Sequence, residues 1–234
     1  MKRSEINKIM RKALQFLKEQ NFHLPKFAYW KMEDWKMKGD EIQEIFDVHL
    51  GWDITDYGSG DFYKMGLMHF TIRNGNTERA SKGGKDYCEK IMIVEQNQTL
   101  PMHLHYSKME DIINRGGGVL MVQLYNSTQE NDFADTSVSI SIDGEIKEVN
   151  PGGIVELTPG ESITIPSRLF HKFWAKEKQG DILIGEVSKI NDDKGDNFYY
   201  DKVGRFPEIE EDEEPLYLLV SDYGKFLNKL NIKV

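Results

Sequence analysis

The stretch PMHLHYSKMED, at positions 101–111, places two histidines one residue apart. Side chains two residues apart on a strand point to the same face, so His103 and His105 are expected to project together. Glu110 follows after a short turn and can return beside them from the next strand. His171, in the strand-like run IPSRLFHKFWA, is the fourth candidate if its strand lies alongside. Three neutral imidazoles and one carboxylate form a good site for a divalent transition metal.

An ordinary hydrogen-bonded role is the alternative for these histidines. A lone histidine on a strand is more often hydrogen-bonded than metal-bound, and a His-x-His pair alone is only suggestive. The remaining histidines, His23, His49 and His69, have no comparable neighbours in the sequence and are predicted to be structural.

The composition is that of a folded globular chain, with 234 residues of which 39% are hydrophobic and 29% charged. The net charge of −9, without a cluster of Lys and Arg, argues against a nucleic-acid partner. No stretch approaches the apolar length needed to cross a bilayer, and residues 1–20 lack the apolar core of a signal peptide. The single cysteine, Cys88, suits a reducing compartment. We therefore expect a cytoplasmic enzyme or binding protein.

The elements that must position the candidate ligands change in type near residue 62. Apolar residues recur at helical spacing after Ser4, a candidate N-cap, and further helices are expected over 32–38 and 40–49. Short β-type runs then follow, separated by turn signals such as the hairpin dipeptide Asp143-Gly144. Closely spaced strands without intervening helices indicate a mainly β protein, here an antiparallel, jelly-roll-like barrel.

We expect one domain over residues 1–234. A helical N-terminal extension (1–60) would pack on the barrel (about 62–190), and residues 191–234 would supply closing loops, a strand and a helix. The acidic run from Glu208 to Glu214 is expected to be a solvated loop, with a metal or cationic partner as the alternative.

The spacing of the candidate ligands resembles the two motifs of the cupin superfamily. The first motif is matched by His103-x-His105, four residues, Glu110, six residues and Gly117. The second is matched by Gly160, five residues, Pro166 and then His171. Cupins usually carry a glycine and often an asparagine near that histidine, where this chain has Arg168 and Ala175. The resemblance implies the cupin-type barrel and the ligand set proposed above.

Over nearly its whole length the chain is also similar to the D-lyxose isomerase family, a sugar-isomerase branch of the cupins. The likeness lies in the stretches SEINKIMRKALQFLKEQNFHLPKFAYW, LGWDITDYGSGDF, FTIRNGN, PMHLHYSKMEDIINRGGG, GEVSKINDD and VGRFPEIEEDE. It implies reversible isomerisation of D-lyxose to D-xylulose, with D-mannose to D-fructose as a related reaction. It also implies one Mn²⁺ per chain, although Co²⁺, Fe²⁺, Ni²⁺ and Zn²⁺ suit the same ligands. A homodimer is expected because cupins often pair through barrel edges.

Such an isomerisation needs a metal that stabilises a cis-enediolate and a base that moves a proton between C2 and C1. Glu186 is the candidate base, because it shares a strand face with aliphatic residues and burial there would raise the pKa of its carboxyl group. An exposed strand position is the alternative. Lys108, between two of the ligands, would hold a sugar oxygen or take part in proton movement, unless it is a solvated turn lysine. A hydride shift is the alternative mechanism, but it usually exploits two metals.

Six further residues are predicted to contact the sugar: Lys90, Asp193, Arg205, Trp52, Phe173 and Glu208. Lys90 alternates with apolar residues toward the barrel mouth, and Phe173 shares the strand face of His171. Asp193 and Arg205 lie in loops that the family resemblance covers. Ordinary surface or core roles are the alternatives for all six.

Other functions compete with the isomerase. A cupin dioxygenase or a phosphosugar isomerase would use a similar ligand set, although no Gly-rich phosphate loop with a partner lysine is present. A metal-containing sugar-binding protein is the non-enzymatic alternative, but such proteins tend to lose ligands, and here all four are present. The sequence favours a small-molecule sugar substrate and neither a nucleic-acid nor a membrane partner.

Overall fold

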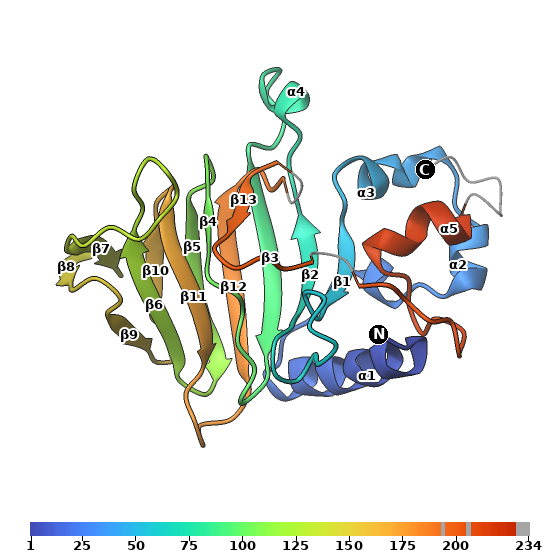
Figure 1. Cartoon of the computed structure of the whole chain (residues 1–234). Coiled ribbons are helices and arrows are strands. Elements are labelled where there is room, and N and C mark those ends of the chain that lie inside the picture. Colours follow the sequence, from blue (N-terminus) through green and yellow to red (C-terminus); the bar gives the residue numbers. More distant parts are fainter. Residues whose placement is uncertain (193–194, 205–206, 228–234) are drawn as a thin grey trace.

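The computed structural model describes residues 1–192, 195–204 and 207–227. Two antiparallel sheets form the body of the molecule (Figure 1). The larger has the order β1-β2-β3-β12-β5-β10-β7-β8, and the smaller has the order β13-β4-β11-β6-β9. The strands are β1 (Gly51–Thr55), β2 (Leu67–Arg73), β3 (Tyr87–Val94), β4 (His103–His105), β5 (Glu110–Gly117), β6 (Leu120–Asn126), β7 (Val138–Ile142), β8 (Glu145–Val149), β9 (Ile154–Leu157), β10 (Ser162–Ile165), β11 (Leu169–Ala175), β12 (Ile182–Lys189) and β13 (Asn197–Tyr199). The predicted mainly β, antiparallel fold is confirmed.

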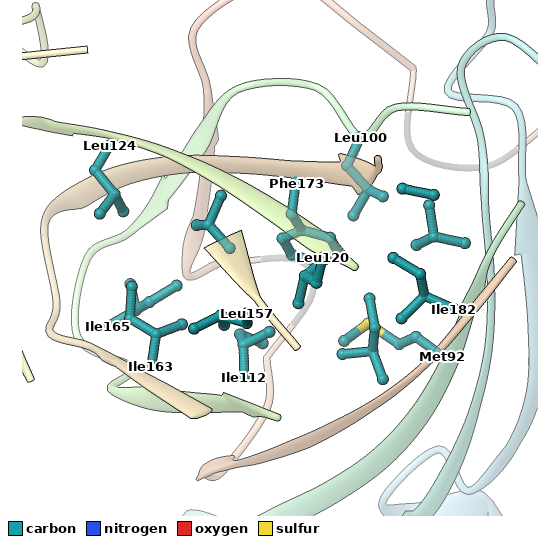
Figure 2. Close-up of a cluster of buried hydrophobic side chains, with 14 of the residues drawn as sticks. Met92, Leu100, Ile112, Leu120, Leu124, Leu157, Ile163, Ile165, Phe173 and Ile182 are labelled. Carbon is teal, nitrogen blue, oxygen red and sulfur yellow. The ribbon is translucent and has the colours of Figure 1, made fainter. Parts of the chain in front are cut away.

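Apolar side chains from both sheets meet in one core (Figure 2). Leu120 and Leu157 enter it from the smaller sheet, and Ile112 and Ile163 from the larger. Alternation along each strand produces this arrangement, because every second side chain points between the sheets. The hairpin predicted at Asp143-Gly144 joins β7 to β8, and both residues have the positive φ that a primed two-residue turn requires.

The helices are α1 (Arg3–Glu19), α2 (Met32–Lys36), α3 (Gln43–Asp47), α4 (Thr77–Ala80) and α5 (Tyr223–Leu227), with short 3₁₀ turns at Lys26–Tyr29, Asp40–Ile42 and Val220–Asp222. All but α4, which projects from the connection between β2 and β3, lie at the β1 end of the larger sheet (Figure 1). The apolar stripe of α1 packs against the outward-facing residues of β2, β3 and β12, including Phe70, Ile91 and Leu183. In the part of the chain that the structure describes, no helix is long and apolar enough to cross a membrane.

The N-terminal region differs from its prediction in two respects. Residues 51–55 form strand β1 inside the segment that was expected to be helical, since Gly51–Thr55 pairs with β2 along its whole length. Ser4 does not cap α1, because the helix begins at Arg3. Its backbone N–H and its hydroxyl both donate to the carboxylate of Asp212, which supplies the cap from the far end of the chain.

The acidic run is not simply a solvated loop. Arg3, which is fully buried, donates hydrogen bonds to the carboxylates of Glu211 and Asp222. Asn7 donates to the carboxylate of Glu213, and Lys225 forms a further ion pair with Glu211. Glu208 and residues 210–214 are exposed, as predicted. The sequence did not reveal that Glu211 and Glu213 accept hydrogen bonds from α1, more than 200 positions away.

Candidate metal and sugar site

The pairing of β4 with β11 brings three histidines together. His103 and His105 lie on β4, and His171 lies directly opposite His103 on β11. All three are buried, and one ring nitrogen of each lies within 4.8 Å of those of the other two. The spacing along one strand therefore places two rings together as predicted, and the register across the strands adds the third.

Each imidazole is oriented by a hydrogen bond from its Nδ1 atom. The acceptors are the carbonyl oxygen of Pro101 for His103 (3.0 Å), the carbonyl oxygen of Leu169 for His171 (3.0 Å) and the side-chain oxygen of Asn197 for His105 (2.7 Å). An oxygen acceptor requires the proton on Nδ1, which leaves the lone pair of Nε2 available to a metal. The Nε2 atoms of His105 and His171 are buried and form no hydrogen bond with any described residue. Such buried acceptors need a partner, and a metal ion fits this donor set.

Burial also keeps the ligands in the protonation state that binds metal. Burial lowers the pKa of His103 well below its ordinary value, and the neighbouring His171 and His105 lower it further. The pKa of His105 is lowered by burial as well. Neutral imidazole is the form that coordinates metal, so these rings are ready to bind at neutral pH.

Glu110, at the start of β5, completes the predicted set of four. Its carboxylate oxygens lie 3.0 Å from Nε2 of His171 and 3.4 Å from Nε2 of His105. Burial would raise the pKa of this carboxyl group. The ammonium group of Lys108, 2.7 Å away, opposes burial and holds the pKa well below its usual range. The fourth candidate ligand is therefore an ionised carboxylate.

Lys108 joins this ligand to the predicted base. Its Nζ atom lies 2.9 Å from a carboxylate oxygen of Glu186 as well as 2.7 Å from Glu110. Burial would lower the pKa of the ammonium group, but the two carboxylates raise it above its ordinary value. The alternative of a solvated turn lysine is excluded, because Lys108 is 4% exposed.

Glu186 is buried on β12 and faces the same space as the metal ligands. Burial favours a raised pKa, but the ammonium groups of Lys108 and Lys90, at 2.9 and 3.6 Å, outweigh it and lower the pKa. The prediction that burial raises the pKa of Glu186 is therefore wrong. The carboxyl group is ionised and able to accept a proton.

One cavity is lined by His103, His105, Lys108, Glu110 and Glu186 together with two of the predicted sugar contacts. Its lining residues are Tyr57, Leu67, His69, Lys90, Met92, Leu100, His103, His105, Lys108, Glu110, Ile112, Phe173, Glu186, Asn191, Asn197 and Tyr199. Lys90 donates a hydrogen bond to the side chain of Asn191 at 2.6 Å. Phe173 lies two residues from His171 on the same face of β11, as expected.

Four other predicted sugar contacts are not placed in this cavity. Trp52 faces the opposite side of β1, where its indole N–H donates to the carbonyl of Ala28 and its ring packs against Phe70. Glu208 is exposed and its side chain does not line the cavity. Both expectations were wrong, the first because Asp53 rather than Trp52 occupies the inward-facing position of β1. Asp193 and Arg205 lie outside the described residues.

Sequence reasoning missed several residues of the cavity. His69 was predicted to be structural, yet it lines the cavity and lies 3.8 Å from the carboxylate of Asp53. Tyr199 lies beside His103, with ring centroids 5.7 Å apart. The period-two pattern of Leu67, His69 and Thr71 was the available signal, but it does not say which face is internal.

The second motif keeps its turn despite its departure from the cupin pattern. Arg168, at the usual glycine position, has φ of 63°, in the left-handed region that glycine would occupy. Its backbone N–H donates to the carbonyl of His105 at 2.7 Å, and its guanidinium group donates to Asn131. These contacts hold the strained backbone and fix the turn that leads to His171.

This two-sheet fold, with three histidines and a glutamate meeting inside it, is that of the cupin class. The model of the family described as D-lyxose isomerase matches residues 1–223. D-lyxose/D-mannose isomerases from Serratia proteamaculans and Escherichia coli O157:H7 are each 42% identical to this chain, over 97% of it and 100% of the relative. The solved structure of an L-ribose isomerase mutant from Acinetobacter sp. DL28, with L-ribose, has a TM-score of 0.58 at 14% identity. It matches 90% of this chain and 98% of that protein, which shows the fold.

The chain belongs to the D-lyxose isomerase family. The predictions of this family and of a sugar isomerase are thereby confirmed.

Proposed function

We propose that this chain interconverts D-lyxose and D-xylulose, and also D-mannose and D-fructose, with one divalent metal ion per chain, Mn²⁺ before the other candidates. The ion would be held by His103, His105, Glu110 and His171. The convergence of these four buried donors beside a second buried carboxylate carries the proposal. The printed activities of relatives that are 42% identical support the choice of sugars. A bound divalent ion would supply a Lewis acid that polarises the sugar carbonyl.

Glu186 would carry the proton. In the aldose-to-ketose direction its carboxylate takes the proton from C2, and the C–H electrons form the C1–C2 double bond of the cis-enediolate. The resulting carboxylic acid returns the proton to C1, while the C2 hydroxyl proton passes to the oxygen on C1. Glu186 begins the reaction ionised, as a general base must, although the neighbouring ammonium groups that lower its pKa make it a weaker base than an isolated carboxylate.

Lys108 would position this base relative to the metal ligands. Its ammonium group contacts Glu110 and Glu186 at once, which ties the carboxylate that binds metal to the carboxylate that moves the proton. Lys90 and Phe173 would supply a polar contact and an apolar wall for the sugar. Asp193 and Arg205 stay proposed contacts on the family resemblance alone.

The surroundings in which the enzyme works are also part of the proposal. We place it in the cytoplasm as a homodimer, without a nucleic-acid partner. The acidic net charge and the single, buried cysteine support this setting. Light scattering coupled to size-exclusion chromatography tests the dimer.

Metal removal tests the function most directly. Protein stripped with a chelator is assayed for conversion of D-lyxose to D-xylulose, before and after Mn²⁺ is restored. We expect activity to disappear without metal and to return with it. Tight metal binding without turnover of D-lyxose or D-mannose would contradict the isomerase proposal. Oxygen consumption by the metal-loaded protein would instead favour the dioxygenase.

A further inference from the structure

The buried polar groups of the cavity extend well beyond the metal ligands and the base. The strands β5, β12, β3, β2 and β1 are successive neighbours in the larger sheet. They carry, in that order, the inward-facing residues Glu110, Glu186, Lys90, His69 and Asp53, each no more than 6% exposed. The polar row thus begins at the metal ligands and ends at a histidine and an aspartate for which the proposed chemistry has no use.

His69 and Asp53 form a pair that is directed at the cavity. They are register partners on β2 and β1, and Nε2 of His69 lies 3.8 Å from Oδ2 of Asp53. His69 lines the cavity together with Lys90 and Glu186. Its neighbours along the strand, Met68 and Phe70, point to the other face and pack with α1.

His69 is a polar side chain on a largely aliphatic inner face. Burying polar groups costs free energy unless something compensates, and most of the inner face is aliphatic. Leu67 and Met92, which flank His69 on this face, belong to the apolar core. An aliphatic residue at position 69 would continue that core. A polar side chain here is explained if the cavity receives a polar ligand.

One cavity connects the two ends of the row. His69 and Glu110 both line it, three strand steps apart in the larger sheet. The register also offsets them along the strands, because Glu110 pairs with Ser188, which pairs with Cys88, whereas His69 pairs with Met92. A sugar held through O1 and O2 at the metal ligands would extend along this cavity toward β2.

We propose that His69, positioned by Asp53, binds the terminal hydroxyl group of the open-chain sugar. This inference rests on the proposed isomerase function and names the residue that recognises the end of the substrate remote from the chemistry. An imidazole suits a hydroxyl group, because one ring nitrogen can donate and the other accept. A hexose carries this hydroxyl one carbon further than a pentose, so His69 also influences the preference between D-lyxose and D-mannose.

The test removes the contact between His69 and the terminal hydroxyl group, first from the protein and then from the sugar. Steady-state kinetics of the Mn²⁺-loaded wild type and of His69→Leu are measured with D-lyxose and with 5-deoxy-D-lyxose, which lacks the terminal hydroxyl. Loss of one hydrogen bond is expected to raise KM for D-lyxose by about 3- to 10-fold. The value of kcat should change less, since the contact is present in both ground state and transition state. With 5-deoxy-D-lyxose the same substitution should leave KM nearly unchanged.

Two matched variants separate recognition from structure. His69→Asn keeps a hydrogen-bonding group and should recover part of the lost affinity for D-lyxose. Phe70→Leu alters the neighbouring buried residue on the other face, and should lower stability without changing KM. Mn²⁺ affinity, measured by calorimetry, should be the same in His69→Leu as in the wild type.

The outcomes distinguish the two proposals. An equal rise of KM for both sugars in His69→Leu, or no rise for either, overturns the role of His69 while the isomerase function stands. A wild-type protein that binds Mn²⁺ but turns over neither sugar overturns the isomerase function, and the role of His69 with it.

Discussion

The two ends of the barrel interior share strands but differ in side chains. On β12, Ile182 and Ile184 lie in the apolar core, whereas Glu186 and Ser188 lie at the polar end. On β5, Glu110 lies at the polar end and Ile112 lies in the core. Figure 2 shows the apolar end, where Leu120, Leu157, Ile163 and Ile165 meet. The apolar end stabilises the fold by burial, and the polar end costs stability but holds the reactive groups.

Alternating positive and negative side chains offset the free-energy cost of burying charge at the polar end. Four charged groups follow one another here, in the order Glu110, Lys108, Glu186 and Lys90. Each has a neighbour of opposite sign within 3.6 Å. Pairs of this kind seldom add net stability, because their attraction does little more than offset the loss of hydration. We infer that these four charged groups serve the reaction and not the stability of the fold. Substitutions at the polar end should therefore affect activity, and substitutions at the apolar end should affect stability.

The largest expected effect is that of Glu186→Gln on activity. The amide keeps the shape of the side chain but cannot accept the C2 proton, so kcat should fall by roughly 10²- to 10⁴-fold. Mn²⁺ binding should persist because Glu186 is not a ligand. Stopped assays of D-lyxose turnover and calorimetric titration of the stripped protein with Mn²⁺ measure the two properties.

The control for this substitution is Glu89→Gln, on the neighbouring strand. Glu89 faces outward and pairs with the exposed Arg73, so its replacement should leave kcat unchanged. Full activity of Glu186→Gln would remove Glu186 from the role of base. Loss of Mn²⁺ binding in that variant would show that the polar end is needed to assemble the metal site.

The apolar end should show the opposite result. Ile163 is fully buried and lies opposite Ile112 in the register of β10 and β5. Ile163→Ala leaves a cavity and should lower the free energy of unfolding by about 2–5 kcal/mol, as measured by urea denaturation. Below the unfolding transition, kcat and KM should match those of the wild type.

Ile146→Ala is the matched control, because Ile146 is 68% exposed and its loss should change stability by less than about 0.5 kcal/mol. If Ile163→Ala altered kcat in the folded protein, the two ends would be mechanically coupled rather than separate.

The sequence allowed the positions of the candidate metal ligands to be predicted more completely than those of the other cavity residues. His103 and His105 share a face by the spacing of a strand, and the motif pattern pointed to His171 and Glu110. The place of His69 in the cavity could not be predicted in the same way, because it depends on the pairing of β2 with β1 and β3. The segment that forms β1 was expected to be helical. A register between strands is a tertiary property that one segment does not encode.

The charged partners of buried or acidic side chains could not be predicted from the sequence either. The sequence predicted that burial would raise the pKa of Glu186, but it did not place two ammonium groups beside the carboxylate. The acidic run is exposed, as predicted, but its partner Arg3 is far away in the sequence and was not foreseen. In both cases the class of environment was foreseen and the partner was not.

The smallest expected effect concerns a polar cluster outside the barrel, formed by Arg3, Glu211 and Asp222. Hydrogen bonds from Arg3 lower the pKa of Glu211 to about 2, against the opposing effect of partial burial. The folded-state pKa lies below the unfolded value of about 4.3, so this pair contributes stability above that pH. The contribution is lost as pH falls from about 4.3 toward 2.

Glu211→Gln should therefore lower Tm by roughly 2–4 °C at pH 7, and the difference from the wild type should shrink as the pH falls toward 2. Calorimetry of both proteins from pH 7 to the lowest pH at which they fold measures it. Isomerase activity at pH 7 should not change, since Glu211 does not line the cavity. A Tm difference independent of pH would show that Glu211 acts by packing and not by charge. A fall in activity as well would show that the cluster of Arg3, Glu211 and Asp222 influences the cavity inside the barrel.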